Sequence, residues 1–228
     1  MTTQQQREYF GENGFIVVPG SIAPEDLARI HADIIALNWR ECEENIWSSP
    51  SASQLVENAP VIVALRACYG EIHCFKCVYV SASPRENAPD GARRQPLHLD
   101  YGTEEFSGDT RNLSPSWVNV GFYLSDLTPE RGPLWVVPKS NHQYGLIPGS
   151  DLEYLDNAAK MVLARAGDAV LFHCFTAHAG GFNFSQSARQ AIFFSFRPNW
   201  ARLLGQESKW PEAAFVGATP ARKKILEG

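Results

Sequence analysis

Apolar residues in the first third of the chain recur at helical spacing. Segment 23–37, APEDLARIHADIIAL, carries its aliphatic side chains on one face and opens with Pro24 and two acidic residues. Proline fits the first helical position, and carboxylates there are stabilised by the positive end of the helix dipole. A second helix is expected to begin at Pro60, in PVIVALRACY, and to end at Gly70 in the left-handed conformation.

From residue 71 onwards, short β segments replace the helical pattern. They are rich in Val, Ile, Phe and Tyr, and Gly, Pro, Asp and Ser separate them. With one earlier strand, the expected strands fall within residues 14–20, 71–81, 116–124, 133–138, 160–165, 168–174 and 189–197. Helices followed by many short strands predict an α+β, mainly β, protein whose body is a sandwich or jelly roll.

Two long polar stretches, 84–97 and 102–116, interrupt the β pattern. Loops of this length in a compact domain are usually functional or mobile. Their charged residues form either a solvated surface or a lid over a polar substrate. These residues are Arg85, Arg93, Arg94, Glu104 and Glu105.

Composition limits the classes of function. The 228 residues, 44% hydrophobic and 20% charged, suit one domain spanning 1–228. The formal net charge of -5 argues against a nucleic-acid partner, which would require a basic surface. No apolar run approaches the roughly 20 residues that span a bilayer, and the N-terminus lacks signal-peptide features. Five cysteines are most simply reduced thiols in a cytoplasmic protein. Nothing in the sequence specifies an oligomeric state.

The stretch QPLHLDYG contains the first candidate chemistry. Residues two apart in an extended segment project to the same side, so His98 and Asp100 direct an imidazole and a carboxylate at one point. A non-haem Fe(II) site uses two histidines and one carboxylate on one face of an octahedron and leaves the other positions open. An isolated His-x-Asp also arises often by chance. A metal site therefore needs a third ligand from another part of the chain.

Two histidines further along are candidates for that ligand. His173 lies inside the apolar segment DAVLFHCF, where a packed, hydrogen-bonded histidine is the ordinary interpretation. His178 is followed by Asn183, Ser185 and Arg189. With the upstream HLD, this spacing resembles the phytanoyl-CoA dioxygenase family of Fe(II)/2-oxoglutarate oxygenases. There the distal histidine precedes Pro-Asn-x-Ser and then an arginine at the same offset, which favours His178.

Other motifs extend this resemblance from about residue 8 to about residue 197. YFGENGFIVVPGSIAPEDL is similar to the family's opening strand and helix, and ARAGDAVLFH to its Gly-Asp turn into a strand. ERGPLWVVPKSNH resembles the family's Gly-x-Leu-x-x-Val-Pro-Gly-Ser-His segment. The chain departs from the pattern where Phe182 replaces the usual proline and Lys139 a glycine, and where Asn141 is an extra residue.

The resemblance implies a double-stranded β-helix, or jelly roll, with N-terminal helices packed on one sheet. It implies that His98, Asp100 and His178 hold Fe(II), that 2-oxoglutarate chelates this iron, and that O2 is the oxidant. The far carboxylate of 2-oxoglutarate would meet Arg189, because a planar guanidinium suits a carboxylate bidentately. Asp100 argues against halogenation, since halogenating relatives leave this position as Gly or Ala.

The resemblance also implies further contacts to 2-oxoglutarate. Trp117 lies near a tryptophan that lines the co-substrate pocket in family members, and Gln95 matches a glutamine that contacts the co-substrate in some relatives. Lys76, on the preceding strand, is a third candidate. Some relatives place a serine two residues after the distal histidine, where this chain has Gly180. The pocket then has one donor fewer, or another donor in its place.

The expected activity is therefore that of a non-haem iron, 2-oxoglutarate-dependent dioxygenase acting on a small organic substrate, with release of succinate and CO2. Hydroxylation, desaturation, epoxidation and ring closure would share the same oxidising step. The absence of a recognisable acyl-CoA signature favours specialised metabolism. Two alternatives stay open: a jelly-roll module that binds metal and 2-oxoglutarate without turnover, and a cupin-like metalloenzyme that uses no oxoacid.

The remaining motifs have structural interpretations. Cys74 and Cys77 form a Cys-x-x-Cys pair, but an offset of three on an alternating strand puts them on opposite faces, so we expect two separately packed thiols. His31 is expected to be structural and His142 to stabilise a loop. Trp200 is expected to pack against the end of the roll.

Overall fold

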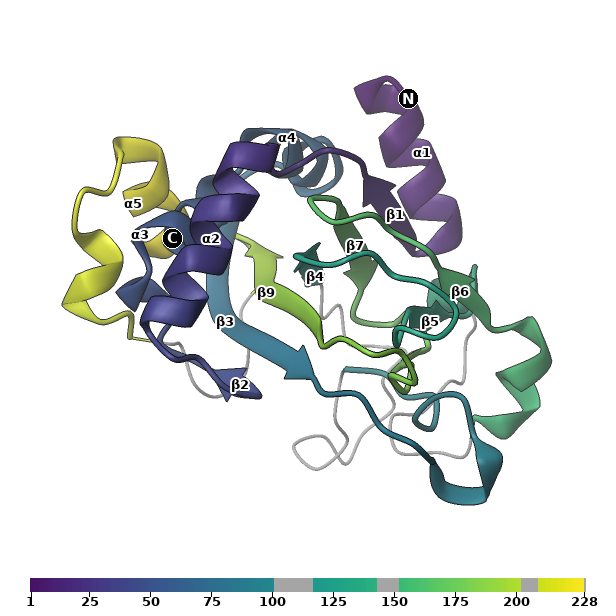
Figure 1. The fold of residues 1–228 in the computed structure, drawn as a ribbon. Helices are drawn as coiled ribbons and strands as arrows, with labels where there is room; N and C mark the ends of the chain where they lie inside the picture. The colour runs from purple at the N-terminus through teal and green to yellow at the C-terminus, as the bar shows by residue number, and fades with distance from the viewer. Residues whose placement is uncertain (101–116, 143–151, 202–208, 228) are drawn as a thin grey trace.

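The computed structural model describes residues 1–100, 117–142, 152–201 and 209–227. Its strands form two antiparallel sheets, one of six strands in the order β1-β7-β4-β9-β3-β2 and one of three in the order β6-β5-β8 (Figure 1). The strands are β1 (Phe15–Val18), β2 (Cys42–Glu43), β3 (Ile72–Ala82), β4 (Val118–Tyr123), β5 (Leu134–Val136), β6 (Lys160–Val162), β7 (Ala169–His173), β8 (His178–Gly180) and β9 (Arg189–Pro198).

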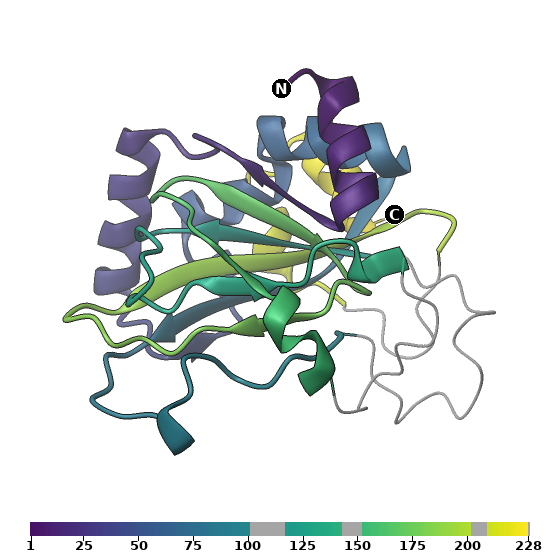
Figure 2. The same ribbon diagram turned by 90° about the vertical axis from the view of Figure 1, so that its right-hand side faces the viewer.

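Helices cover one face of the six-stranded sheet, as Figures 1 and 2 show for those near the N-terminus. The α-helices are α1 (Thr3–Asn13), α2 (Pro24–Ala36), α3 (Pro50–Ser53), α4 (Ala59–Tyr69) and α5 (Pro220–Glu227). Short 3-10 helices are η1 (Ile46–Ser48), η2 (Gln54–Glu57), η3 (Pro89–Gly91), η6 (Ser140–His142), η7 (Glu153–Ala158) and η8 (Glu212–Phe215). None of the helices in the described ranges is both long and apolar enough to cross a bilayer.

Alternation along the central strands gives the large sheet two different faces. On β4, Val118, Val120 and Phe122 are buried in the core that the sheet forms with the helices. Asn119 and Gly121 therefore point to the opposite side, towards the three-stranded sheet. We call this side the inner face. Side chains from both sheets form a second core there, which makes the body a two-layered jelly roll.

The helices predicted from apolar spacing are confirmed. In α2, Pro24 occupies the first turn with Glu25 and Asp26, and Ile30 and Ile34 are buried against the sheet. The helix α4 ends at Gly70 as expected, with a φ of 72°. Its ψ of -131° differs from the predicted left-handed helical value, because the chain turns straight into the extended β3. Only glycine adopts this region readily.

Three α-helices and two short strands had no apolar pattern to reveal them. The helix α1, TQQQREYFGEN, is polar, and Phe10 is its buried residue. Its N-terminus is held by a capping box, in which the Thr2 side chain and the Gln5 side chain each bond the other's backbone N–H. The other unpredicted α-helices and strands are α3, α5, β2 and β8, none longer than eight residues. Local periodicity is a weak signal over such lengths.

The prediction that Cys74 and Cys77 face opposite sides of their strand is wrong. A β-bulge at Phe75 adds one residue to β3, so Cys74 pairs with Phe196 and Cys77 with Phe194. Those partners are two residues apart on β9 and share a face, and both thiols are buried in the same core. Both are free, and burial raises the pKa of each, that of Cys77 to about 12. Both are packed side chains, as expected, but they lie in the same core instead of on opposite faces of the strand.

The polar stretch 84–97 is fastened to the body by its arginines. It contains η3 and forms a β-bridge between Arg94 and Gly181. The arginine contacts are Arg85 with the ring of Phe182, Arg93 with Glu130, and Arg94 with Asp156. These contacts favour a structural role over a lid for this stretch. The second predicted loop, 102–116, lies outside the described residues.

The C-terminal end of α1 docks onto the segment that precedes β8. Gly14 has a φ of 76°, and its carbonyl accepts hydrogen bonds from the backbone N–H of His173 and the hydroxyl of Thr176, at 2.8 Å each. Lys139 has a φ of 67°, which explains why glycine is commonest at this position in the family it resembles. Its N–H donates to the carbonyl of Asn13. The helix is thus locked to the loop that leads into the second histidine candidate.

Replacement of Gly14 by alanine is expected to destabilise the fold by about 1–3 kcal/mol. A Cβ there would lie 2.3 Å from Thr176 Oγ1 and 2.6 Å from Asn141 Oδ1, in a left-handed backbone. Gly11→Ala is the matched control, because a Cβ at Gly11 meets no atom within 4 Å and alanine favours the helix. Urea unfolding followed by circular dichroism measures both, and equal stability for the two variants would contradict the docking described.

Candidate metal centre

One antiparallel bridge brings two histidines together. The N–H of His98 donates to the carbonyl of His178, and the N–H of His178 donates back, both at 2.9 Å. Directly paired residues present their side chains on the same face. The two imidazoles accordingly lie side by side, with ring centroids 4.4 Å apart. Since His178 begins β8, both rings lie between the two sheets, at the inner face.

Asp100 completes a group of three potential ligands. Its Oδ1 lies 3.4 Å from Nε2 of His178, and its side chain is 26% exposed. One ligand atom from each of the three side chains can be chosen so that all lie within 4.8 Å of one another. No other group of three His, Cys, Asp or Glu side chains in the described part of the chain is arranged in this way.

Backbone carbonyls fix which ring nitrogen of each histidine is free. Nδ1 of His178 lies 2.9 Å from the carbonyl of Thr176, and Nδ1 of His98 lies 3.3 Å from that of Pro96. A carbonyl can only accept, so each Nδ1 carries the proton and each Nε2 keeps its lone pair. This is the tautomer that ligates a metal through Nε2 with Nδ1 held by an outer hydrogen bond.

The three groups perturb one another's protonation. Burial, and then the neighbouring His178, lower the pKa of His98. Burial would raise the pKa of Asp100, but its charge interaction and hydrogen bond with His178 outweigh this and lower it. Burial opposes the charged form of His178 as well, and Asp100 outweighs it and raises that pKa. Each of these two side chains thus favours the charged form of the other, and a bound cation would compete with a proton for Nε2 of His178.

Arg189 lies on the inner face at the start of β9. Strand alternation places it on the same side as Ser195, whose neighbour across the sheet is Asn119. Its guanidinium acts electrostatically on Tyr123. Its Nε is buried and has no hydrogen-bond partner within the described residues. A buried cationic donor in this state is suited to an anionic ligand.

Comparison with protein families identifies the chain. The family model for phytanoyl-CoA dioxygenase matches residues 10–191, which include the three clustered side chains and Arg189. The chain belongs to the phytanoyl-CoA dioxygenase family. The family consists of non-haem iron dioxygenases, with Fe(II) as the metal and 2-oxoglutarate as the co-substrate. A search of curated proteins found no match.

Solved structures support the fold of this phytanoyl-CoA dioxygenase family member. HygX from Streptomyces hygroscopicus, with nickel and 2-oxoglutarate bound, is 16% identical with a TM-score of 0.68, and the match covers 88% of both chains. SnoK, a non-heme alpha ketoglutarate dependent carbocyclase from nogalamycin biosynthesis, is 18% identical with a TM-score of 0.66, covering 86% of this chain and 85% of SnoK. EvdMO1 is 20% identical with a TM-score of 0.68, and the match covers 87% of this chain but only 50% of the EvdMO1 chain. The predicted jelly roll is confirmed.

The other residues that family resemblance assigns to 2-oxoglutarate lie at different places around the triad. Lys76 is exposed, pairs with Ser195, and helps to lower the pKa of Asp100, so it is at the level of the metal ligands. Oε1 of Gln95 lies 3.4 Å from where a Cβ on Gly180 would be, so this amide is beside the position where some relatives have serine. Both assignments stay predictions.

Trp117 lies at the opposite end of β4 from Arg189. It immediately precedes Val118, which pairs with Phe196, whereas Tyr123 at the other end pairs with Ala191. The Trp117 ring packs edge-on against Phe75, with centroids 6.1 Å apart. Its predicted contact with 2-oxoglutarate is untested, and it lies two residues before Asn119, on the side of that residue away from the arginine.

The competing residues have the structural roles expected of them, with one exception. Burial lowers the pKa of His173 to about 4, and its Nδ1 accepts a hydrogen bond from the N–H of Phe175, outside the cluster of ligands. A ring nitrogen of His31 bonds the carbonyl of Leu124, and His142 bonds Gly11 in α1. The expectation for Trp200 is wrong, because its side chain is 66% exposed beyond the end of β9. The position of a tryptophan just after the last strand does not predict whether its side chain is buried.

Two polar residues next to the triad were missed from the sequence. Asn119 donates a hydrogen bond to Asp100 Oδ2, and Ser195 donates to Asn119 Oδ1 at 2.6 Å. Both lie in the middle of hydrophobic strands. A polar residue among apolar ones on a central strand was the available signal, because an inward polar group needs a partner.

The family motif around Asn183 also has a structural explanation. The Asn183 side chain is buried, donates to the carbonyls of Ala82 and Ser187, and accepts from Ser185. These bonds shape the turn that leads into β9 and so set the position of Arg189.

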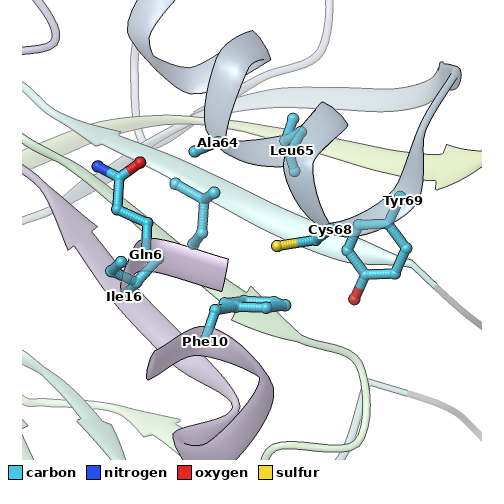
Figure 3. Close-up of a pocket in the computed structure, with 8 residues that line it drawn as sticks. Gln6, Phe10, Ile16, Ala64, Leu65, Cys68 and Tyr69 are labelled. Carbon is cyan, nitrogen blue, oxygen red and sulfur yellow. The ribbon is translucent and has the colours of Figure 1, made fainter. Parts of the chain in front are cut away.

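A separate apolar crevice lies on the other side of the large sheet. It lies between α1 and α4, where Figure 3 shows Phe10, Cys68 and Tyr69 around it, and it is too narrow to hold a water molecule. Its lining residues also include Leu171, which faces the helices. No candidate ligand of the triad lines it. It is a packing gap under the helices and not part of the metal centre.

Removal of one clustered side chain is expected to abolish retention of iron. We expect His98→Ala and Asp100→Ala to lose bound Fe(II) after anaerobic loading and desalting, because two remaining ligands hold the ion weakly. His173→Gln is the control, since this side chain lies outside the group, and it should keep wild-type iron content. Metal analysis and circular dichroism measure loading and folding. Full loading of folded His98→Ala would exclude the triad.

Proposed function

We propose that this protein uses Fe(II), held by His98, Asp100 and His178, to couple oxidation of a small organic substrate to conversion of 2-oxoglutarate and O2 into succinate and CO2. The observation that carries the proposal is the convergence of three ligand atoms from two distant segments at the inner face, with the buried, unpaired Nε of Arg189 on that same face. Fe(II), when bound, supplies the activation of O2 that no side chain can provide.

The residues between the triad and Arg189 fit the co-substrate. Phe193 and Gly121 are paired and lie on the inner face between Ser195 and Arg189. A Cβ on Gly121 would lie 2.6 Å from the ring of Phe193, so the absence of a side chain gives that ring its place. Phe193 is half-buried although its strand is central, so it borders open space. We place the carbon chain of 2-oxoglutarate over Phe193, with its far carboxylate on Arg189.

The protein's own part is to bind, orient and exclude water. Three protein ligands on one face leave the remaining positions for the oxoacid and O2. Gln95, beside Gly180, replaces the serine donor that some relatives use. Phe172 packs against His178 with ring centroids 4.7 Å apart and keeps that ligand dry. Trp117 and Phe75, at the other end of the triad, form an aromatic wall for the approaching substrate.

Specialised metabolism is the proposed setting. Two of the solved structures come from one biosynthesis: SnoK is described as a carbocyclase from nogalamycin biosynthesis, and SnoN as an epimerase from nogalamycin biosynthesis. These relatives support a free natural-product substrate for this chain, with hydroxylation as the simplest outcome. Asp100 leaves no vacant ligand position for a halide, so we expect oxygenation rather than halogenation.

Turnover is expected to give one succinate and one CO2 per 2-oxoglutarate and O2 consumed. In hydroxylation one oxygen atom enters succinate and the other enters the substrate C–H bond, so atoms and electrons balance. Iron-loaded protein with ascorbate and candidate natural products tests this by succinate release and oxygen uptake. Metal and 2-oxoglutarate binding without oxygen uptake in any substrate class would indicate a binding module. Substrate oxidation indifferent to 2-oxoglutarate would indicate a cupin-like enzyme.

Arg189→Ala is expected to raise the KM for 2-oxoglutarate by about 10–100-fold, because a charge-assisted hydrogen bond to a carboxylate contributes roughly 1.5–3 kcal/mol. Arg189→Lys should recover part of the loss, since lysine keeps the charge but not the planar fork. Arg29→Ala, on the exposed side of α2, is the matched control and should leave the KM unchanged. Steady-state succinate release measures all three. An unchanged KM in Arg189→Ala would place the co-substrate elsewhere.

A further inference from the structure

The two oxygens of Asp100 have different environments. Oδ1 faces Nε2 of His178 at 3.4 Å and belongs to the clustered ligand atoms. Oδ2 faces away and accepts a hydrogen bond from the side-chain amide of Asn119. The Asn119 carbonyl oxygen in turn accepts from the hydroxyl of Ser195 at 2.6 Å. A short chain of hydrogen bonds thus begins in the sheet and ends on the oxygen that does not face the histidine.

The direction of this chain is fixed by chemistry. Asp100 can ligate a metal only as a carboxylate, and a carboxylate can only accept hydrogen bonds. The Asn119 amide must therefore present its NH2 group to Asp100 and its oxygen to Ser195. The Ser195 hydroxyl is left as the donor. Each link has one possible polarity, so the loss of Ser195 would release the Asn119 amide to rotate.

The two strands that carry Asn119 and Ser195 are each paired on both sides within the six-stranded sheet. The two residues are direct partners on β4 and β9, in the middle of the six-stranded sheet. Their neighbours Val118, Val120 and Phe194 are at most 1% exposed. Asp100, in contrast, lies outside the strands of the described residues, two positions beyond the bridge at His98. The central strands therefore supply, through the Asn119 amide, a hydrogen bond that holds one oxygen of Asp100.

We propose that Asn119 is a positioning residue that makes Asp100 a one-oxygen ligand, and that Ser195 acts by orienting Asn119. A carboxylate can bind a cation through one oxygen or through both. The amide on Oδ2 holds the carboxylate so that Oδ1 alone is directed at the ion. The position that a second oxygen would take stays open for 2-oxoglutarate. This inference rests on the proposed metal site.

The test is calorimetric titration of the metal-free protein with Ni(II), which binds without turnover. Asn119→Ala is expected to weaken Ni(II) binding by about 10–100-fold, the usual cost of losing an outer hydrogen bond to a ligand. Ser195→Ala should weaken it by several-fold. The double variant should bind like Asn119→Ala, since Ser195 acts through Asn119. In the Ni(II)-loaded Asn119→Ala protein, 2-oxoglutarate should also bind more weakly.

Tyr79→Phe is the matched control. It removes a hydrogen bond from Gln190 to the Tyr79 hydroxyl, which joins β9 to its other neighbour β3, but Tyr79 lies on the helix side of the sheet. Its Ni(II) affinity should equal that of the wild type. Thermal unfolding of each metal-free variant separates loss of folding from loss of positioning, because the positioning role predicts weaker metal binding at an unchanged midpoint.

The inference would be overturned by a folded Asn119→Ala protein that binds Ni(II) as tightly as the wild type. A second variant covers the case in which Asn119→Ala is unstable. If Asn119→Ala does not fold, Ser195→Ala decides: wild-type Ni(II) and 2-oxoglutarate affinity in that variant rejects the chain of hydrogen bonds. Failure of the metal site itself looks different, because wild-type protein and Asp100→Ala would then bind Ni(II) equally, whatever Asn119 does.

Discussion

The pairing of His98 with His178 is the contact on which the site depends. The two residues come from distant parts of the chain, and a single bridge with two hydrogen bonds places their rings on one face. Burial determines which face this is. Leu97 and Leu99 are 7% and 6% exposed and lie in one core with Ala177 and Ala179 on the outer side of the small sheet. Apolar burial on one side therefore turns the imidazoles inward on the other.

Much of the fold followed from local pattern. The apolar spacing of α2, its Pro24 and its acidic first turn were sufficient to place that helix, and the β-rich segments gave the main strands to within a few residues. The polar α1 could not be recognised in this way, because its stability comes from a capping box and from docking at Gly14 rather than from an apolar face. Tertiary contacts of this kind have no local signature.

The residues of the candidate site were predictable from the sequence, but the hydrogen bonds that support them were not. Alternation in HLD and the offsets after His178 indicated all three ligand candidates and Arg189. Asn119 and Ser195 escaped because their contact depends on the register between β4 and β9. The register between two strands is decided by how the whole strands pack. The residues next to Asn119 and Ser195 in the sequence therefore do not reveal that these two are paired. The same limit applies to Trp117, whose distance from Arg189 along the strand became visible only with that register.

The bulge at Phe75 lets β3 bury Cys74 and Tyr79 in the core beneath the helices while Lys76 points away from that core. Before it, β3 alternates in one phase, and after it in the other. With strict alternation from Cys74, the side chain of Lys76 would enter the apolar core beneath the helices, and Tyr79 would turn away from that core. Burying an ammonium there without a counter-charge would be strongly unfavourable. The single inserted residue thus turns Lys76 to the exposed inner side, where its charge acts on Asp100. Deletion of that residue during evolution would invert the remainder of the strand.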